Sequence, residues 1–343
     1  MVLQGDKRPH SYAAPPLKRT RLVDEEGQLE AESQPEPCGE LAPEVLFEQG
    51  GNWARPPLPT DLDAAKHNLA FQLIDVDHFI EGATEDGKVP ETTAVLRLFG
   101  VTKAANSVAV HVRGFRPYFY VEAPAGFGAE DLGRFEKQLE SALSKNASNL
   151  PRGLKKMVLG TELVTGETIY GFHQNEKFQF IKIYLPLPRL ITTAKKALEG
   201  NDLASFPNLK AYEANIDFEI RFMVDHEVTG GGWVELQAGY YQLISNRQDM
   251  KSRCQIEAVV DAGRGGLEAK GAEGEWSELA PFRILSFDIE CAGRRGIFPE
   301  AEVDPVIQIA SVVKEQGAAE PFIRNVFVLG TCAPIVGAQI VHC

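Results

Sequence analysis

The chain has 343 residues, 44% of them hydrophobic, and a formal charge of −13 at pH 7. Its length allows about two domains, and the negative charge argues against a protein that coats nucleic acid nonspecifically, because such binding depends on Lys and Arg. The sequence contains no apolar run of the roughly 18 residues that a membrane span needs, no secretory signal, and no zinc or disulfide pattern among its five cysteines, so we expect a soluble intracellular protein.

Residues 1–67 are expected to form a disordered tail. They are rich in Pro, Glu, Gln and Gly and poor in regularly spaced apolar residues, so they cannot bury enough apolar surface to offset the entropy of ordering. Two basic clusters lie in this tail, Lys7-Arg8 and the stretch LKRTR at 17–21. They are candidates for a bipartite nuclear-import signal; a solvated tail without that role is the alternative.

Residues 68–279 are predicted to form an α+β domain. The stretches SVAVHVRGF (107–115) and NIDFEIRFMVD (215–225) alternate apolar and polar residues, which is typical of half-buried strands. On the polar side of the second stretch, Arg221 and Asp225 are expected to form a structural ion pair.

Two helices are predicted in the same domain. The stretch AEDLGRFEKQLESALSKN (129–146) has an apolar stripe at three- and four-residue spacing behind acids in its first turn. The stretch PRLITTAKKALEG has Pro188 at its start and Gly200 at its end, as helices commonly do. The glycine-rich segment 261–276 lacks apolar periodicity and is predicted to be a loop or linker.

A new unit is expected at 280–343, beginning with three strand-like runs, FRILSFDIE, DPVIQIASVV and PFIRNVFVL. The first run is apolar at most positions, which is typical of a strand buried on both faces of a sheet. It also carries Asp288 and Glu290, whose side chains point to the same face of a strand because they are two residues apart. Carboxylates bind hard cations such as Mg²⁺, so the pair is a candidate metal site; two acids at the solvated end of a strand are the alternative.

The residues around this pair resemble a known family. The stretch SFDIECAGRRGIFPEAEVDPVIQIAS (286–311) closely resembles the first exonuclease motif of the family B DNA polymerases, and its CAGRRGIFPE portion is similar to their delta-type members. GFRPYFYVEAPAGF (114–127) and YEANIDFEIRFMVD (212–225) resemble segments of the N-terminal domain of the same proteins, in the same order. The resemblance extends over about residues 69–340.

The resemblance implies an α+β N-terminal domain followed by the first strands of an incomplete ribonuclease H-like 3′-5′ exonuclease domain. It implies that Asp288 and Glu290 bind two Mg²⁺ ions in a proofreading site. It further implies a DNA primer-template as substrate, accessory polymerase subunits and a sliding clamp as partners, and a place in nuclear DNA replication.

In that family, the exonuclease needs four carboxylates, and later motifs supply two further Asp residues. After Asp288 the sequence contains only Asp304, which directly precedes Pro305, and it contains no palm-domain Asp motif. We therefore expect an N-terminal fragment that is inactive by itself. The alternatives are a stand-alone exonuclease, which the missing acids disfavour, and a short noncatalytic module that binds nucleic acid or a partner.

Other residues leave two interpretations open. Arg294 and Arg295 follow the acidic strand, where they would contact the phosphates of a frayed primer end or simply lie in a solvated turn. Tyr118, Phe119 and Tyr120 suggest a surface on which single-stranded template stacks, although strand alternation places at least one of the three in the core.

Overall fold

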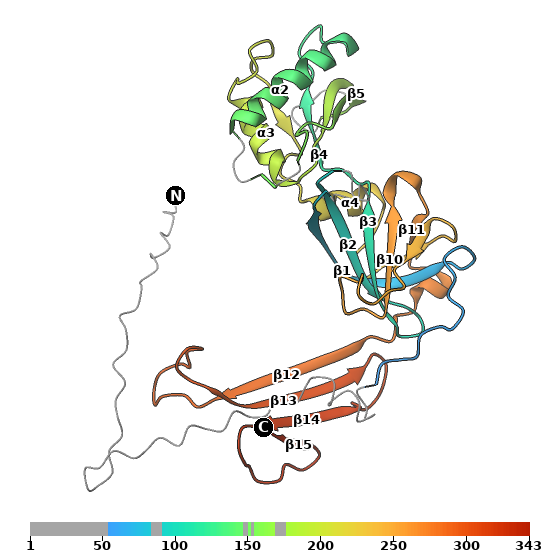
Figure 1. The fold of residues 1–343 in the computed structure, drawn as a ribbon, viewed down its shortest axis with the longest axis vertical. Helices are drawn as coiled ribbons and strands as arrows, with labels where there is room; N and C mark the ends of the chain where they lie inside the picture. Colours follow the sequence, from blue (N-terminus) through green and yellow to red (C-terminus); the bar gives the residue numbers. More distant parts are fainter. Residues whose placement is uncertain (1–53, 84–90, 147–149, 152–153, 169–175) are drawn as a thin grey trace. The chain divides into compact units, whose positions relative to one another are not determined.

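The structure is a computed structural model that describes residues 54–83, 91–146, 150–151, 154–168 and 176–343 (Figure 1). The two basic clusters of the expected import signal lie outside these residues. Strands of the described chain form three sheets, one of seven strands and two of four. Among the described residues, no helix combines the length and the apolarity that a bilayer crossing requires.

The seven-stranded sheet has the order β11-β8-β1-β2-β3-β10-β9, and all its neighbours are antiparallel except β3 and β10. One core lies against it, built from alternate side chains of these strands together with Phe218 and Phe222. Its strands are β1 (Leu69–Glu81), β2 (Thr93–Val101), β3 (Ser107–Arg113), β8 (Trp233–Leu236), β9 (Tyr241–Leu243), β10 (Ile256–Asp261) and β11 (Leu267–Lys270).

The predicted strand at 107–115 is confirmed as β3, but its expected half-burial is wrong. Ala109 and His111, on the side expected to face solvent, are buried like the valines between them. The reason is the central position of β3 between β2 and β10, where His111 lies 2.7 Å from the carboxylate of Glu257.

The predicted strand at 215–225 is wrong, because Phe218–Asp225 forms the helix α4. Asp217 occupies the N-cap position with an extended backbone, and Glu219 lies in the first turn, where a helix favours acids. Phe218 and Phe222 are one helical turn apart and are both buried, while Ile220 and Val224 are exposed.

Two further expectations for this part of the chain need correction. The segment 261–276 is not a plain loop, since it contains β11, which pairs with β8, and two short 3-10 turns. Residues 54–67, inside the expected tail, are held against the seven-stranded sheet: the amide of Gln255 donates to the carbonyl of Pro56 at 2.7 Å, and Leu62 packs on the core. Ordered chain therefore begins before the expected domain.

The first four-stranded sheet has the order β5-β6-β4-β7, with β4 and β6 at its centre. Its elements follow one another as strand, helix, two strands, helix and strand: β4 (Tyr118–Glu122), α2 (Leu132–Asn146), β5 (Gly160–Gly166), β6 (Phe178–Tyr184), α3 (Arg189–Glu199) and β7 (Ala211–Tyr212). Both predicted helices are confirmed. The two helices cover one face of the sheet and share a second core with it (Figure 1).

The second four-stranded sheet has the order β12-β13-β14-β15, so β12 is an edge strand. The three predicted strands are confirmed, and a fourth joins them: β12 (Arg283–Cys291), β13 (Val306–Glu315), β14 (Ile323–Val328) and β15 (Gln339–His342). The expected burial of β12 on both faces is wrong, because Arg283 to Glu290 are all exposed in the described chain.

Candidate functional site

Asp288 and Glu290 lie near the end of β12, and their side chains point to the same face of the sheet. Antiparallel pairing with β13 places Asp288 opposite Ala310 and Glu290 opposite Gln308. The register shifts directly after Glu290, so the regular ladder ends at the second acid. The small side chain of Ala310 leaves space beside Asp288 on this face.

Both carboxylates are exposed and available as oxygen donors. One oxygen of Asp288 accepts a hydrogen bond of 2.9 Å from the N–H of Ile289. Within the residues that the structure describes, neither acid is engaged in an ion pair. The geometry therefore brings together the two acids that the sequence singled out.

Arg294 and Asp304 form a structural ion pair beside this strand. The guanidinium of Arg294 donates two hydrogen bonds of 3.2 Å to the Asp304 carboxylate, which also accepts one of 2.8 Å from the N–H of Glu300. The Glu300 N–H, together with the Arg294 charge, holds the pKa of Asp304 below its usual value. Arg294 thus fixes the connection after β12, while Arg295 is exposed.

Asp304 is buried, with only 4% of its surface exposed. Its oxygens are occupied by Arg294 and Glu300, so it is not offered to the face that carries Asp288 and Glu290. In the described ranges, no three or more His, Cys, Asp or Glu side chains gather closely enough to hold a metal ion. Strand β12 therefore supplies two carboxylates, Asp288 and Glu290, to a metal site.

The three aromatic residues at 118–120 have different surroundings. Phe119 is fully buried in the core beneath α2 and α3, and Tyr118 is buried with its hydroxyl donating to Asp225 at 2.8 and 2.7 Å. Burial, aided by the hydrogen bond to Asp225, raises the pKa of Tyr118. Tyr120 alone of the three keeps part of its surface exposed.

The expected ion pair between Arg221 and Asp225 is wrong, although both residues are structural. Arg221 donates instead to Glu213 at 2.6 Å, and its guanidinium lies 4.7 Å from the ring centre of Tyr118. Asp225 accepts from Tyr118. From the helix, Arg221 reaches Glu213 in the segment before α4, whereas Asp225 reaches Tyr118 on β4. The two residues therefore have different partners and do not pair with each other.

Two pockets lie on the first four-stranded sheet and its helices. The larger has a volume of about 640 Å³ and is lined by Tyr120, Phe180, Lys182 and Tyr212, among others. The sequence singled out Tyr120 but missed the other three, although the alternation in FQFIKIY on β6 would have placed Phe180 and Lys182 on one face.

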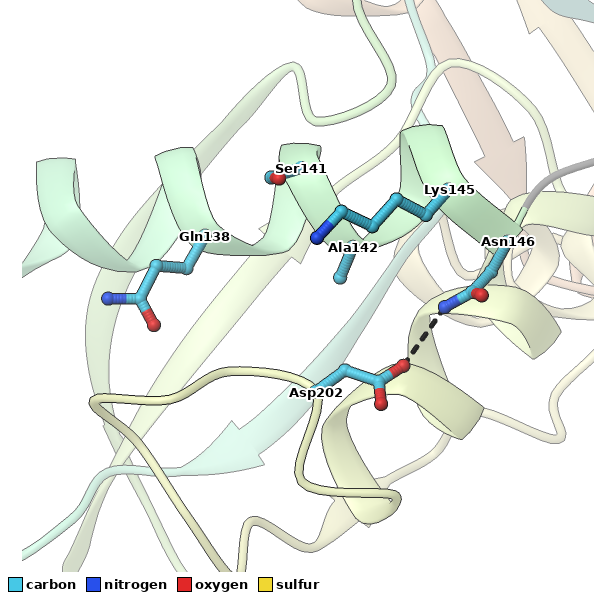
Figure 2. Close-up of a pocket in the computed structure, with 6 residues that line it drawn as sticks. All are labelled: Gln138, Ser141, Ala142, Lys145, Asn146 and Asp202. Atoms are coloured by element: carbon cyan, nitrogen blue, oxygen red, sulfur yellow. Dashed lines mark hydrogen bonds between the residues drawn. The ribbon is translucent and has the colours of Figure 1, made fainter.

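The smaller pocket, of about 260 Å³, lies between α2 and the segment after α3 (Figure 2). Gln138, Lys145 and Asn146 project from α2 toward it, and Asn146 donates a hydrogen bond of 2.9 Å to Asp202 (Figure 2). This bond closes one end of the pocket and joins the two segments, so the pocket is explained as part of their packing.

Comparison with known proteins identifies related sequences for both parts of the chain. Residues 209–341 match the family described as "DNA polymerase family B, exonuclease domain", and residues 114–192 match "DNA polymerase delta catalytic subunit-like, N-terminal domain". The proteins named DNA polymerase delta catalytic subunit from Drosophila melanogaster and Bos taurus are 46% and 41% identical to this chain over 300 and 336 residues.

These matches cover 84% and 94% of this chain but 27% and 29% of the two relatives, so the chain spans less than a third of their length. A solved structure, that of the family B DNA polymerase from the archaeon Pyrobaculum calidifontis, superposes with a TM-score of 0.51 at 20% identity. The superposition covers 79% of this chain and 27% of the archaeal one. It confirms the fold class expected from the sequence.

Proposed function

The chain belongs to the family B DNA polymerases, and on that premise we propose that it is the N-terminal part of a delta-type replicative DNA polymerase with 3′-5′ proofreading exonuclease activity. The observation that carries the proposal is the exposed, same-face pair Asp288 and Glu290 on β12, inside the segment that matches the exonuclease domain. The strand ladder holds the two side chains in a fixed relation.

Asp288 and Glu290 are the residues that would hold divalent cations, with Mg²⁺ as the proposed cofactor. Their carboxylates are hard oxygen donors, and neither is engaged by a basic side chain in the described residues, so the donor set fits Mg²⁺. When bound, such ions supply Lewis acidity for phosphodiester hydrolysis. The acids themselves would position the ions on one face of the strand.

The 343-residue chain is proposed to be inactive by itself. Asp304, the last Asp in the sequence, is held by Arg294 and Glu300 rather than offered beside Asp288. A site of four carboxylates therefore takes its other acids from elsewhere in a longer polymerase. The proposed organisation is an N-terminal tail whose last residues, 54–67, pack against the polymerase N-terminal domain at 68–279, followed by the start of the exonuclease domain at 280–343.

The proposed partners follow from the proposed activity. They are a DNA primer-template, accessory polymerase subunits and a sliding clamp, and the proposed location is the nucleus. The relatives support this proposal through their name, DNA polymerase delta catalytic subunit.

The test is to replace Asp288 or Glu290 by Ala in the complete polymerase that carries these residues. Replacing a residue that only hydrogen-bonds to a metal ligand typically lowers metal affinity or activity by about 10- to 100-fold. Loss of Asp288 or Glu290 itself should therefore slow removal of a mispaired 3′ nucleotide by at least about 100-fold. Nucleotide addition should be unchanged, because it uses different acids. Both rates are measured on the same labelled primer-template.

Glu302→Ala is the matched control, since Glu302 is also an exposed acid of this unit but lies outside the strand. It should leave both rates unchanged. An equal loss of addition and removal in the Asp288 and Glu290 variants would overturn the proposed roles.

A further inference from the structure

The connection between β12 and β13 begins directly after the two acids, at a break in the strand ladder. Glu290 lies opposite Gln308, but the next pair joins Cys291 to Val306, so Ile307 is an extra residue on β13. A bulge of this kind bends the strand and redirects the side chains beside it, and it is common next to active sites. The direction of the Glu290 carboxylate therefore depends on what holds the chain beyond the bulge.

Two contacts close this connection. The N–H of Ala292 donates a hydrogen bond of 2.9 Å to the carbonyl of Pro305, directly beyond the last strand pair. Two residues further along, the Nε and Nη2 groups of Arg294 donate to the two carboxylate oxygens of Asp304, each at 3.2 Å. Arg294 follows Glu290 by four residues, so this second contact holds the chain that leaves the acidic strand.

Asp304 is a fixed partner for Arg294. Its side chain is buried, and one oxygen also accepts a hydrogen bond of 2.8 Å from the N–H of Glu300. The N–H of Asp304 in turn donates to the carbonyl of Glu300 at 2.9 Å, so the residue is held at both its backbone and its side chain. A buried carboxylate that loses its cation is strongly destabilised. The pair is therefore kept in one arrangement.

The same contacts argue against a phosphate contact by Arg294, one of the two roles that the sequence left open. A guanidinium binds a phosphate best with two parallel N–H groups, and here two such groups, on Nε and Nη2, already face Asp304. Nη2 also lies 3.3 Å from the carboxylate of Glu300. With two carboxylates around it, Arg294 is better suited to hold its own chain than to attract DNA.

We propose that Arg294 and Asp304 form a positioning pair that holds Glu290 in the direction in which it binds a divalent cation. The pair acts through the backbone from Cys291 to Gly293 and contacts neither the cation nor the DNA. The inference rests on the proposed exonuclease function, and it adds two supporting residues to the two-acid site.

The test measures removal of a mispaired 3′ nucleotide by the complete polymerase at increasing Mg²⁺ concentrations. Groups that support a metal ligand typically change metal affinity or activity by about 10- to 100-fold, so Arg294→Leu and Asp304→Asn should each raise the Mg²⁺ concentration for half-maximal removal about ten-fold. At saturating Mg²⁺, the removal rate and the KM for DNA should return to the parent values. Nucleotide addition should be unchanged throughout, which also shows that the variants fold.

Arg324→Leu is the matched control. Arg324 forms an exposed pair with Glu320 at 2.7 Å in the same sheet, but it lies opposite Val312 rather than beside Glu290, so its loss should leave the Mg²⁺ dependence unchanged. Arg294→Lys keeps the charge without the two-pronged contact, so its shift should be smaller than that of Arg294→Leu. The double variant Arg294→Leu/Asp304→Asn should need no more Mg²⁺ than Arg294→Leu, because residues that act as one unit are not additive.

Hydrogen–deuterium exchange of the same polymerases without divalent cations gives a readout that does not depend on activity. Amides that lose a closing contact open more readily. Residues 290–293 should therefore exchange faster in Arg294→Leu than in the parent, and at the parent rate in Arg324→Leu.

An unchanged Mg²⁺ dependence in folded Arg294→Leu would overturn the inference, even with faster exchange. A raised KM for DNA at saturating Mg²⁺ would also overturn it, by assigning Arg294 to the substrate, as would additive shifts in the double variant. Asp288→Ala in the same assay separates the two proposals. If it abolishes removal while Arg294→Leu has no effect, only this inference fails; if it leaves removal intact, the exonuclease function fails, and this inference with it.

Discussion

At the scale of single residues, Glu257 shows how a buried carboxylate joins segments of the seven-stranded sheet. It lies 2.7 Å from the ring nitrogen of His111 and accepts hydrogen bonds from the N–H groups of Lys251 and Ser252 at 2.8 and 2.9 Å. Burial by itself raises the pKa of Glu257, but these bonds and the Ser252 hydroxyl outweigh it and hold the pKa below the usual 4.5. The carboxylate is therefore charged at neutral pH.

Glu257→Gln should destabilise the chain at pH 7, because it removes the charge from four hydrogen-bonded contacts. The expected loss in free energy of unfolding is about 1–3 kcal/mol. Since the folded pKa is lowered, the stabilisation is present above pH 4.5 and is lost as the pH falls through the folded pKa. The difference between parent and variant should therefore shrink below pH 4.5, as measured by urea unfolding followed by tryptophan fluorescence.

The control is Glu320→Gln, which alters an exposed acid paired with Arg324. Surface pairs contribute little, so this variant should unfold like the parent chain at every pH. A constant difference for Glu257→Gln between pH 7 and pH 3 would contradict the role given to its charge.

The sequence located some of the candidate residues and missed others, for a physical reason. Asp288 and Glu290 lie on one strand, so a period of two is enough to put them on one face. Phe180 and Tyr212 meet Tyr120 only because β4 pairs with β6 and β7, which lie far along the chain. Pairing between distant strands is not encoded in local alternation.

At the scale of single elements, α4 shows how one pattern fits two structures. Alternate apolar residues predicted a strand, but the same stretch also places Phe218 and Phe222 four residues apart. In a strand, Ile220 would share their buried face, whereas on the helix it is 50% exposed. The core against the seven-stranded sheet selected the helix, which the local pattern left undecided.

Phe222→Ala should destabilise the chain by about 3–5 kcal/mol, because it leaves a cavity in the core. Ile220→Ala should have a much smaller effect, since half of that side chain already meets solvent. A strand would bury both residues alike, so similar losses in the two variants would contradict the helix. Thermal unfolding by circular dichroism measures both.

Elements with strong local signals were predicted well. α2 has an apolar stripe, α3 has Pro188 and Gly200 at its ends, and β12 to β14 have dense apolar runs. The short strands β11 and β15 have few residues and form because a neighbouring strand offers its edge. Such strands depend on tertiary pairing more than on their own sequence.

At the scale of the whole molecule, the second four-stranded sheet exposes an apolar face on its edge strand. Leu285, Phe287 and Ile289 alternate on the side of β12 opposite the two acids, and Ile289 pairs with the exposed Ile309 of β13. An exposed apolar edge strand offers both surface and unpaired backbone groups to another chain.

The 343-residue chain should therefore associate with itself as its concentration rises. Phe287→Lys should lower the association constant about ten-fold or more, because a buried Phe contributes about 1.5–3 kcal/mol. Val224→Lys is the matched control, because Val224 is as exposed as Phe287 but lies on α4. Sedimentation velocity over a range of concentrations measures the association; a chain that stays monomeric, or equal effects of both variants, would contradict this prediction.

The fold class followed from the sequence, but the order of strands did not. The parallel pair β3 and β10 joins residues at opposite ends of the predicted α+β domain. No motif near Val110 or Ala258 indicates that these two residues lie side by side.

That parallel pair has a consequence for the order in which the protein matures. β3 ends at Arg113 and β10 begins at Ile256, and the whole unit from Tyr118 to Tyr212, with its two helices and own core, is contained in the interval. On the ribosome, this inserted unit is complete before β10 has been synthesised, so we expect it to fold first. Once folded, it replaces much of a flexible loop of roughly 140 residues and so lowers the entropic cost of bringing β10 to β3.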